Sequence, residues 1–120
     1  MARRFVIRLT HAGDDVERTG SALTVAATAL ASGVDVELWL IHDAVELAKP
    51  GAVETLHLEH SPPLAELFAS VLAGGKVFAC TQCLLRRGIA AEDLIPGITP
   101  AGAAALVASL AEEGAVPLGF

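Results

Sequence analysis

The sequence predicts a single α/β domain over residues 1–120, a three-layer α/β/α sandwich built on a mainly parallel sheet. The main observation is that segments with the apolar pattern of strands alternate along the chain with helical segments. The composition agrees, because 53% of the residues are hydrophobic but only 4% are aromatic, so Ala, Val and Leu supply most of the core. A chain of 120 residues is long enough for one core and too short for two independent ones.

The first part of the chain predicts a βαβ unit. Residues 4–10 and 34–41 have the pattern of strands, and the second of these segments alternates apolar positions with polar ones. Between them, residues 15–32 form a helical stretch that Gly33 ends. We therefore expect these two strands to be parallel, with a right-handed crossover between them.

A second helix is predicted within residues 61–75. Ser61 is expected to cap this helix, Pro62 or Pro63 to occupy its first turn, and a glycine pair to end it. The apolar segment KVFAC follows directly, and residues 76–80 are therefore expected to form the next buried strand.

The remaining chain predicts two more helices and a last strand. Residues 81–87 are expected to form a short helix, and residues 99–114 a longer one in which Thr99 is the cap and Pro100 the first helical position. The closing segment AVPLGF reads as a short strand. Pro117 places this strand at an edge of the sheet, because proline cannot donate a hydrogen bond to a neighbouring strand.

The first predicted helix, residues 15–32, carries no charge after Arg18 and so has no wide polar face. A helix that is apolar most of the way round is usually buried on more than one side. In so small a domain the second cover is expected from another subunit, which predicts a homo-oligomer. The alternative is a helix half exposed through Ser21, Thr24 and Thr28.

Charge and hydropathy exclude several classes of partner. The net charge of −6 argues against nucleic acid, which needs a basic surface. The uncharged stretches 19–34 and 94–111 are too short or too rich in Pro and Gly to span a membrane. The amino-terminal segment does not resemble a signal peptide, because charge returns at Arg8, so a cytoplasmic location is expected. Asp14 and Asp15 would repel phosphate, and no cofactor is predicted.

The two cysteines are the main candidates for chemistry. Cys80 ends a predicted parallel strand, where ligands and reactive groups gather in such sheets. The start of the following helix, together with Arg86 or Arg87, would stabilise a thiolate there. Cys83 lies three residues further on and can attack a sulfur bound to Cys80. The alternative for both cysteines is a role as small buried apolar residues.

Other polar residues offer weaker candidates. His11, Asp14 and Arg18 follow the first strand and are expected to form a polar cluster at the same sheet edge as Cys80, with His11 as a proton carrier. Their alternative is capping and ion pairing. His42 also follows a strand, and the same two interpretations apply.

A zinc site would need two ligands besides the cysteines. His57 and His60 are the obvious pair, but their spacing is shorter than usual and there is no second CxxC motif. We therefore predict no metal.

The chain contains, in this order and over nearly its whole length, the segments THAGDDVERTG, GVDVELWLIHDAVELAKPG, SPPLAELFASVLAGGKVFACTQCLLRRGI and AEDLIPGITPAGAAALVASLAEEGAVPLGF. Through these segments it resembles the DsrE/DsrF-like family, whose members include sulfur-relay proteins and predicted peroxiredoxins. In sulfur-relay members a cysteine follows a strand and precedes an Arg-Gly pair, which matches Cys80 with Arg87 and Gly88. Many relatives also carry a CxxC there, which matches Cys80 and Cys83.

The resemblance implies a cytoplasmic homo-oligomer, often a trimer or hexamer. Its strand-end cysteine would accept sulfur as a persulfide from a donor and hand it on to an acceptor, which is a sulfur-handling or thiol-redox function. Two alternatives remain. One is a non-catalytic oligomeric module that binds a small ligand or a protein, and the other is a thiol peroxidase.

Overall fold

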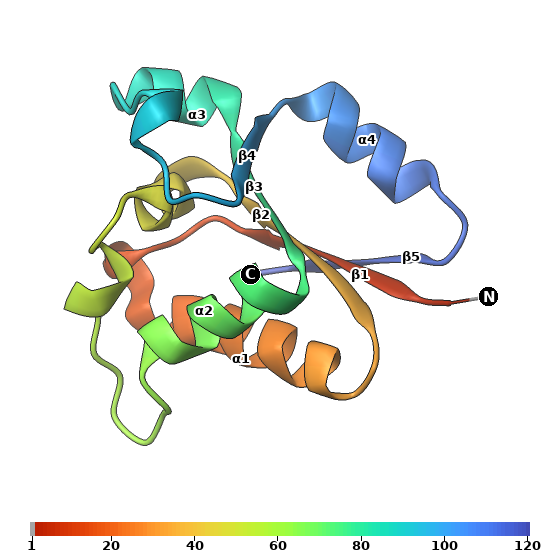
Figure 1. The fold of residues 1–120 in the computed structure, drawn as a ribbon, viewed down its shortest axis with the longest axis horizontal. Helices are drawn as coiled ribbons and strands as arrows, with labels where there is room; N and C mark the ends of the chain where they lie inside the picture. The colour runs from red at the N-terminus through yellow and green to blue at the C-terminus, as the bar shows by residue number, and fades with distance from the viewer. Residues whose placement is uncertain (1) are drawn as a thin grey trace.

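The computed structural model describes residues 2–120, which form a five-stranded sheet in the order β4-β3-β2-β1-β5, with every neighbouring pair parallel. The strands are β1 Arg4–Leu9, β2 Asp35–Leu40, β3 Lys76–Cys80, β4 Ile98–Ala101 and β5 Ala115–Gly119. The α-helices are α1 Val16–Ala31, α2 Leu64–Gly74, α3 Thr81–Arg86 and α4 Ala103–Ala111. Helices α1 and α2 lie on one side of the sheet and α4 on the other (Figure 1), which confirms the predicted α/β/α architecture.

The predicted βαβ unit is confirmed, because local signals at both ends of α1 act as expected. The Asp15 side chain accepts a hydrogen bond from the Arg18 backbone N–H at 3.1 Å and so caps the helix. After the helix, Gly33 takes the left-handed conformation with φ of 84°. Strand β2 then pairs in parallel with β1, from Arg4 opposite Asp35 to Leu9 opposite Leu40.

The main core lies between the sheet and the α1/α2 layer. Alternate strand residues point into this layer, as the period of two requires. They meet fully buried side chains of α1 such as Leu23 and of α2 such as Phe68. The buried strand residues of this face are Ile7, Leu9, Val36, Leu38, Leu40, Val77 and Ala79.

The outer face of α1 is formed by Ser21, Thr24 and Thr28, all of which are exposed. The sheet and α2 cover the rest of the helix (Figure 1). Both alternatives predict this exposure in a single chain, so coverage of α1 by a second subunit stays a prediction. Within residues 2–120, no helix is both long enough and apolar enough to cross a membrane.

The predicted start of the last helix is wrong. Thr99 and Pro100 belong to β4, where Pro100 lies opposite Ala79 of β3, and the helix begins only at Ala103 after Gly102. A Thr-Pro pair is a common helix start, but here the pairing with β3 takes precedence. Proline is tolerated because β4 is an edge strand, whose outer side has no neighbour to bond. The helix also ends earlier than expected, at residue 111 rather than near 114.

The predicted cap of α2 is also wrong. The helix begins at Leu64, and the Ser61 hydroxyl donates to the Pro62 carbonyl at 2.8 Å instead of capping the helix. The helical conformation is disfavoured for Pro62 because a second proline follows it. Pro63 is not helical either, since its ψ is 129°. The predicted edge position of the last strand is confirmed, since β5 with Pro117 pairs only with β1.

The opposite face of the sheet carries a buried charged network that holds α4. Glu37, only 7% exposed, accepts hydrogen bonds from Trp39 Nε1 at 3.1 Å and from Ser109 Oγ of α4 at 2.7 Å. Its second carboxylate oxygen lies 3.0 Å from Arg4 Nε. Arg4 also donates to the Ser109 carbonyl at 2.7 Å. The carboxyl-terminal half of α4 is therefore anchored to β1 and β2 through Ser109.

Candidate functional site

Both cysteines lie at the carboxyl edge of the sheet. Cys80 is the last residue of β3, stands opposite Ala101 of β4, and is half-buried. Helix α3 begins at the next residue, Thr81, and carries Cys83 in its first turn. Cys83 is 2% exposed, and both cysteines are free thiols. The pair therefore consists of one sulfur that reagents can reach and one that is enclosed.

Cys83 is held in its protonated form by its surroundings. Burial raises the pKa of the Cys83 thiol, and the neighbouring Cys80 thiol raises it further. The His42 backbone N–H, which donates to Cys83 Sγ at 3.2 Å, lowers the pKa, as does the charge of Arg87, but these effects are smaller in sum. Cys83 is therefore a poor nucleophile near neutral pH, where its thiolate is scarce.

His42 contributes to the site through its backbone. It follows β2, the strand next to β3, and has φ of 54°, which is uncommon for a residue other than glycine. Its side chain is exposed, whereas its N–H points to Cys83 Sγ. The sequence placed His42 after a strand but carried no signal that its amide group would contact a cysteine.

Arg87 ties α3 to the segment that carries His42. Its Nη2 lies 2.7 Å from Asp43 Oδ1, and its Nη1 donates to the Cys83 carbonyl at 3.2 Å. Asp43 lies in the first turn of the 3-10 helical segment His42–Ala48. Arg87 therefore fixes the position of Cys83 relative to the His42 amide, whereas its neighbour Arg86 is exposed. A thiolate-stabilising role of Arg87 toward Cys80 stays a prediction.

Replacing Arg87 by alanine is expected to make Cys83 less reactive. The charge of Arg87 lowers the pKa of Cys83, so its removal raises that pKa further and shifts the alkylation profile of Cys83 to higher pH. Site-resolved alkylation from pH 7 to 10 measures this shift. Arg86→Ala is the matched control, because it removes the same charge from an exposed position, and an equal shift in both variants would contradict the role of Arg87.

A small pocket opens beside Cys80 on the α4 side of the sheet. Its volume is about 190 Å³. The lining residues come from β2 and its end, from β3 and the start of α3, and from β4 and α4. They are Trp39, Ile41, Cys80, Thr81, Gln82, Ala101, Gly102, Ala103 and Leu106. The sequence carries no signal for this pocket, because the pocket forms only where β4 and α4 dock beside β3.

The predicted polar cluster of His11, Asp14 and Arg18 forms, but with its members bonded to one another. Arg18 Nη1 lies 3.3 Å from His11 Nε2, and His11 Nδ1 lies 2.8 Å from Asp14 Oδ2. Because arginine can only donate, His11 Nε2 accepts and its Nδ1–H donates to Asp14. The Ala12 N–H and His11 together hold the pKa of Asp14 below its usual value. Both ring nitrogens of His11 are therefore occupied.

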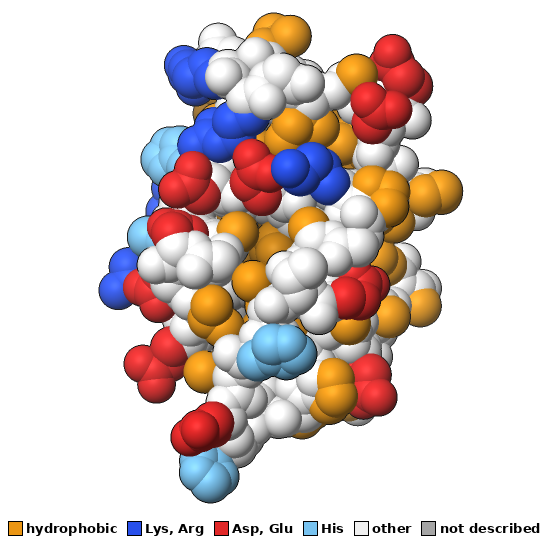
Figure 2. All heavy atoms as spheres, turned by 90° about the vertical axis from the view of Figure 1, so that its left-hand side faces the viewer, with side chains coloured by type: hydrophobic (Ala, Val, Ile, Leu, Met, Phe, Trp, Pro, Cys, Tyr) orange, Lys and Arg blue, Asp and Glu red, His pale blue; other side chains and the backbone are white. Residues whose placement is uncertain are grey.

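This cluster lies at the same sheet edge as the cysteines but does not contact them. Within residues 2–120, no hydrogen bond or ion pair joins His11, Asp14 or Arg18 to either sulfur. Arg18 also pairs with Asp15 at 3.6 Å, as the capping alternative expected. Figure 2 views this edge and shows acidic and basic side chains interspersed around apolar ones. A proton-carrying role of His11 stays a prediction.

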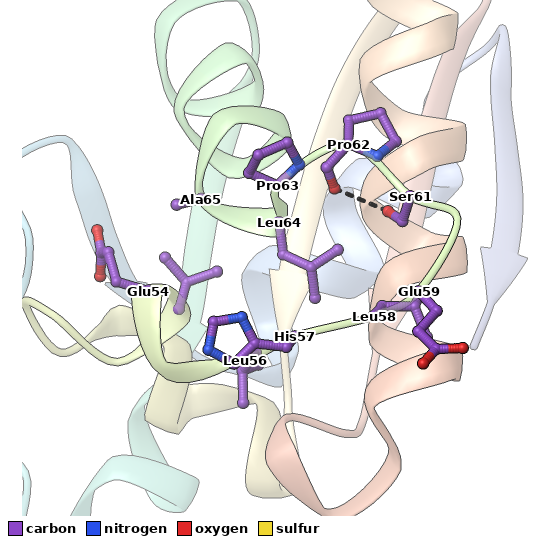
Figure 3. Close-up of a pocket in the computed structure, with 11 residues that line it drawn as sticks. Glu54, Leu56, His57, Leu58, Glu59, Ser61, Pro62, Pro63, Leu64 and Ala65 are labelled. Carbon is purple, nitrogen blue, oxygen red and sulfur yellow. Dashed lines mark hydrogen bonds between the residues drawn. The ribbon is translucent and has the colours of Figure 1, made fainter.

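His57 and His60 lie apart from the cysteines. Figure 3 shows His57 beside a different pocket, of about 340 Å³, formed by the loop before α2 and the first residues of that helix. Both histidines are exposed. In the part of the chain that the structure describes, no three His, Cys, Asp or Glu side chains gather as metal ligands.

Two curated proteins resemble the chain in sequence. The chain is 32% identical over 111 residues to the uncharacterized protein MJ0989 of Methanocaldococcus jannaschii, and the match covers 92% of this chain and 94% of that protein. It is 37% identical over 83 residues to the uncharacterized protein MK0008 of Methanopyrus kandleri, and this match covers 68% of this chain and 65% of that protein.

Two solved structures share the fold over almost their whole length. The YchN protein of E. coli matches with a TM-score of 0.77 at 22% identity, covering 100% of both chains. MTH1491 of Methanobacterium thermoautotrophicum, a protein of unknown function, matches with a TM-score of 0.74 at 16% identity, covering 98% of this chain and 99% of that one. A family model matches residues 3–116. The chain therefore belongs to the DsrE/DsrF-like family.

Proposed function

We propose that this protein handles sulfur through its two cysteines, with Cys80 accepting a sulfur atom as a persulfide and Cys83 acting as the resolving thiol. The observation that carries the proposal is the unequal setting of the two thiols. Cys80 is half-buried beside a pocket, whereas Cys83 is buried and its pKa is raised. Membership of the DsrE/DsrF-like family supports the same class of chemistry.

The proposed reaction has two steps. A Cys80 thiolate attacks the outer sulfur of a donor persulfide R–S–SH, the S–S bond of the donor breaks, and RS⁻ leaves, so that Cys80 carries S–SH. An acceptor thiolate can then take that outer sulfur and release the Cys80 thiolate. If no acceptor arrives, the scarce thiolate form of Cys83 slowly attacks Cys80 Sγ, HS⁻ leaves, and a Cys80–Cys83 disulfide forms. A cytoplasmic location, which we also propose, would supply the reductant for this disulfide.

The test is mass spectrometry of the whole protein after incubation with inorganic polysulfide. Wild-type protein is expected to gain the mass of sulfur on a cysteine, and dithiothreitol should remove it. The double variant Cys80→Ser, Cys83→Ser should gain none. If neither the wild-type protein nor Cys83→Ser, which cannot form the disulfide, gains sulfur, the non-catalytic binding module would replace this proposal.

We also propose that the protein self-associates through α3 and α4. Leu85 of α3 is 79% exposed and Val107 of α4 is 64% exposed. Around Val107, α4 exposes alanines and carries no charged residue. These helices therefore present more apolar surface to solvent than α1 does, and surface of this kind is typical of interfaces. A trimer or hexamer is the assembly that family membership favours.

Val107→Asp is expected to weaken this assembly. A carboxylate at an apolar contact loses hydration without gaining a partner, so sedimentation velocity at micromolar concentration should show a shift toward the monomer. Ser21→Asp, on the exposed face of α1, is the control and should leave the assembly intact. A monomeric wild-type protein, or dissociation by Ser21→Asp alone, would contradict this interface.

A further inference from the structure

The pocket beside Cys80 has no charged wall. Of its nine lining residues, Cys80 alone is ionisable, and Thr81 and Gln82 are the only others with polar side-chain groups besides the indole of Trp39. That indole N–H already donates to Glu37. The remaining walls are Ile41, Ala101, Gly102, Ala103 and Leu106. The surface that a molecule meets next to the Cys80 sulfur is therefore mainly apolar.

Two basic residues of this sheet edge, Arg87 and Arg18, are engaged elsewhere, and the exposed Arg86 does not line the pocket. Arg87 pairs with Asp43, and Arg18 bonds to His11 and Asp15. None of these residues lines the pocket. A carboxylate, sulfonate or ammonium group placed in the pocket would therefore lose water without meeting an opposite charge, which is strongly unfavourable.

The size of the pocket limits its occupant. At about 190 Å³ it is smaller than the roughly 300–1,000 Å³ of sites for drug-sized ligands. It is slightly larger than an apolar cavity of about 150 Å³ that accepts benzene. Trp39, 2% exposed and stacked on Phe78 with ring centroids 4.6 Å apart, gives the pocket a rigid aromatic wall.

We propose that the small molecule that exchanges sulfur with Cys80 is an organic thiol, or its persulfide, with an uncharged apolar body about the size of a benzene ring. This inference rests on the proposed function and names its substrate class. The body occupies the space between Trp39 and Leu106, which places its sulfur next to Cys80. In the transfer, the thiolate RS⁻ attacks the outer sulfur of Cys80–S–SH, the S–S bond breaks, the Cys80 thiolate leaves, and R–S–SH forms without net oxidation or reduction.

The test uses two acceptors that differ by a carboxylate group at the far end of the ring. Wild-type protein is first loaded with inorganic polysulfide, which has no organic body, and is then mixed with benzyl mercaptan or with 4-(mercaptomethyl)benzoate. Sulfur transfer to benzyl mercaptan is expected to be at least tenfold faster, because only its ring enters the pocket without losing the hydration of a carboxylate. Equal rates from a loaded protein would overturn the inference and leave the proposed function intact.

Binding can be measured without the chemistry. Trp39 is the only tryptophan of the chain and lines the pocket, so its fluorescence reports occupancy. In Cys80→Ser, benzyl mercaptan is expected to change this fluorescence saturably, with the carboxylated analogue at least tenfold weaker. If polysulfide loading of the wild-type protein fails, the proposed function fails, and this titration still decides whether the pocket selects uncharged ligands. No saturable change with benzyl mercaptan would overturn the inference.

A positive charge placed in the pocket wall should alter the preference for benzyl mercaptan over its carboxylated analogue. Leu106→Lys puts an ammonium group beside the bound ring and is expected to reduce or reverse the tenfold preference for benzyl mercaptan. Leu106 is partly exposed, so the lysine stem can be accommodated. Leu110→Lys is the matched control, on the same helix and partly exposed but outside the pocket, and should keep the wild-type preference. An unchanged preference in Leu106→Lys would show that the pocket does not select the acceptor.

Discussion

Replacing Cys80 by serine is expected to abolish sulfur uptake from a persulfide donor, a loss of at least a hundredfold in initial rate. Serine keeps the size of the side chain but lacks the thiolate that attacks the donor. Cys83 cannot take over, because it is 2% exposed and its pKa is raised, so its thiolate is both scarce and enclosed near neutral pH. Site-resolved mass spectrometry of the intact variant after timed exposure to donor measures the effect.

Cys83→Ser is the matched control for this experiment. It should take up sulfur at close to the wild-type rate, because Cys80 keeps its place at the end of β3. It should also hold the persulfide longer, since no resolving thiol remains nearby to displace HS⁻. Sulfur uptake by Cys80→Ser, or its loss in Cys83→Ser alone, would reverse the roles assigned to the two cysteines.

Glu37→Ala is expected to lower the free energy of unfolding by about 3 kcal/mol, because removing one partner of a buried ion pair leaves the other charge uncompensated. Arg4 keeps its second acidic neighbour, Glu112 at 3.3 Å, so we expect a loss near the lower end of the 3–5 kcal/mol range. Trp39 and Ser109 would also lose their acceptor. Urea unfolding, followed by far-UV circular dichroism, measures the change.

Asp35→Ala serves as the control for Glu37→Ala. Asp35 lies on the same strand but is exposed, so its replacement should change the free energy of unfolding by less than about 0.5 kcal/mol. Because Glu37 anchors α4 through Ser109, its loss should also widen the range of thiols that react with Cys80. A stable Glu37→Ala variant would show that the network contributes little to holding α4.

The parts of the fold that could be predicted from the sequence are those governed by local signals. Asp15 and Gly33 mark the ends of α1 because a carboxylate cap and a left-handed glycine act within a few residues of the chain. Thr99 and Pro100 gave an equally familiar local signal, but the long-range pairing of β4 with β3 overrode it. Local patterns therefore located the helices better than they located the edge strand.

In the candidate site, too, local features could be predicted from the sequence and long-range contacts could not. The position of Cys80 at the carboxyl edge followed from the strand pattern alone. The partner of Arg87 did not, because Asp43 lies 44 residues away in the chain. The contact of the His42 amide with Cys83 depends on a positive φ, which is uncommon for residues other than glycine, and the pocket depends on how α4 docks. These contacts exist only in the folded chain.

The most direct test of the unequal roles of the two sulfurs is the alkylation of both cysteines in the folded wild-type protein as a function of pH. A limiting amount of iodoacetamide, followed by site-resolved mass spectrometry, gives the rate for each thiol. We expect Cys80 to be labelled first at neutral pH, and Cys83 to react only at distinctly alkaline pH or after denaturation, because burial raises its pKa. Equal rates for the two thiols would contradict their unequal roles. A Cys80 that resists labelling until the protein is denatured would show that both cysteines are buried core residues.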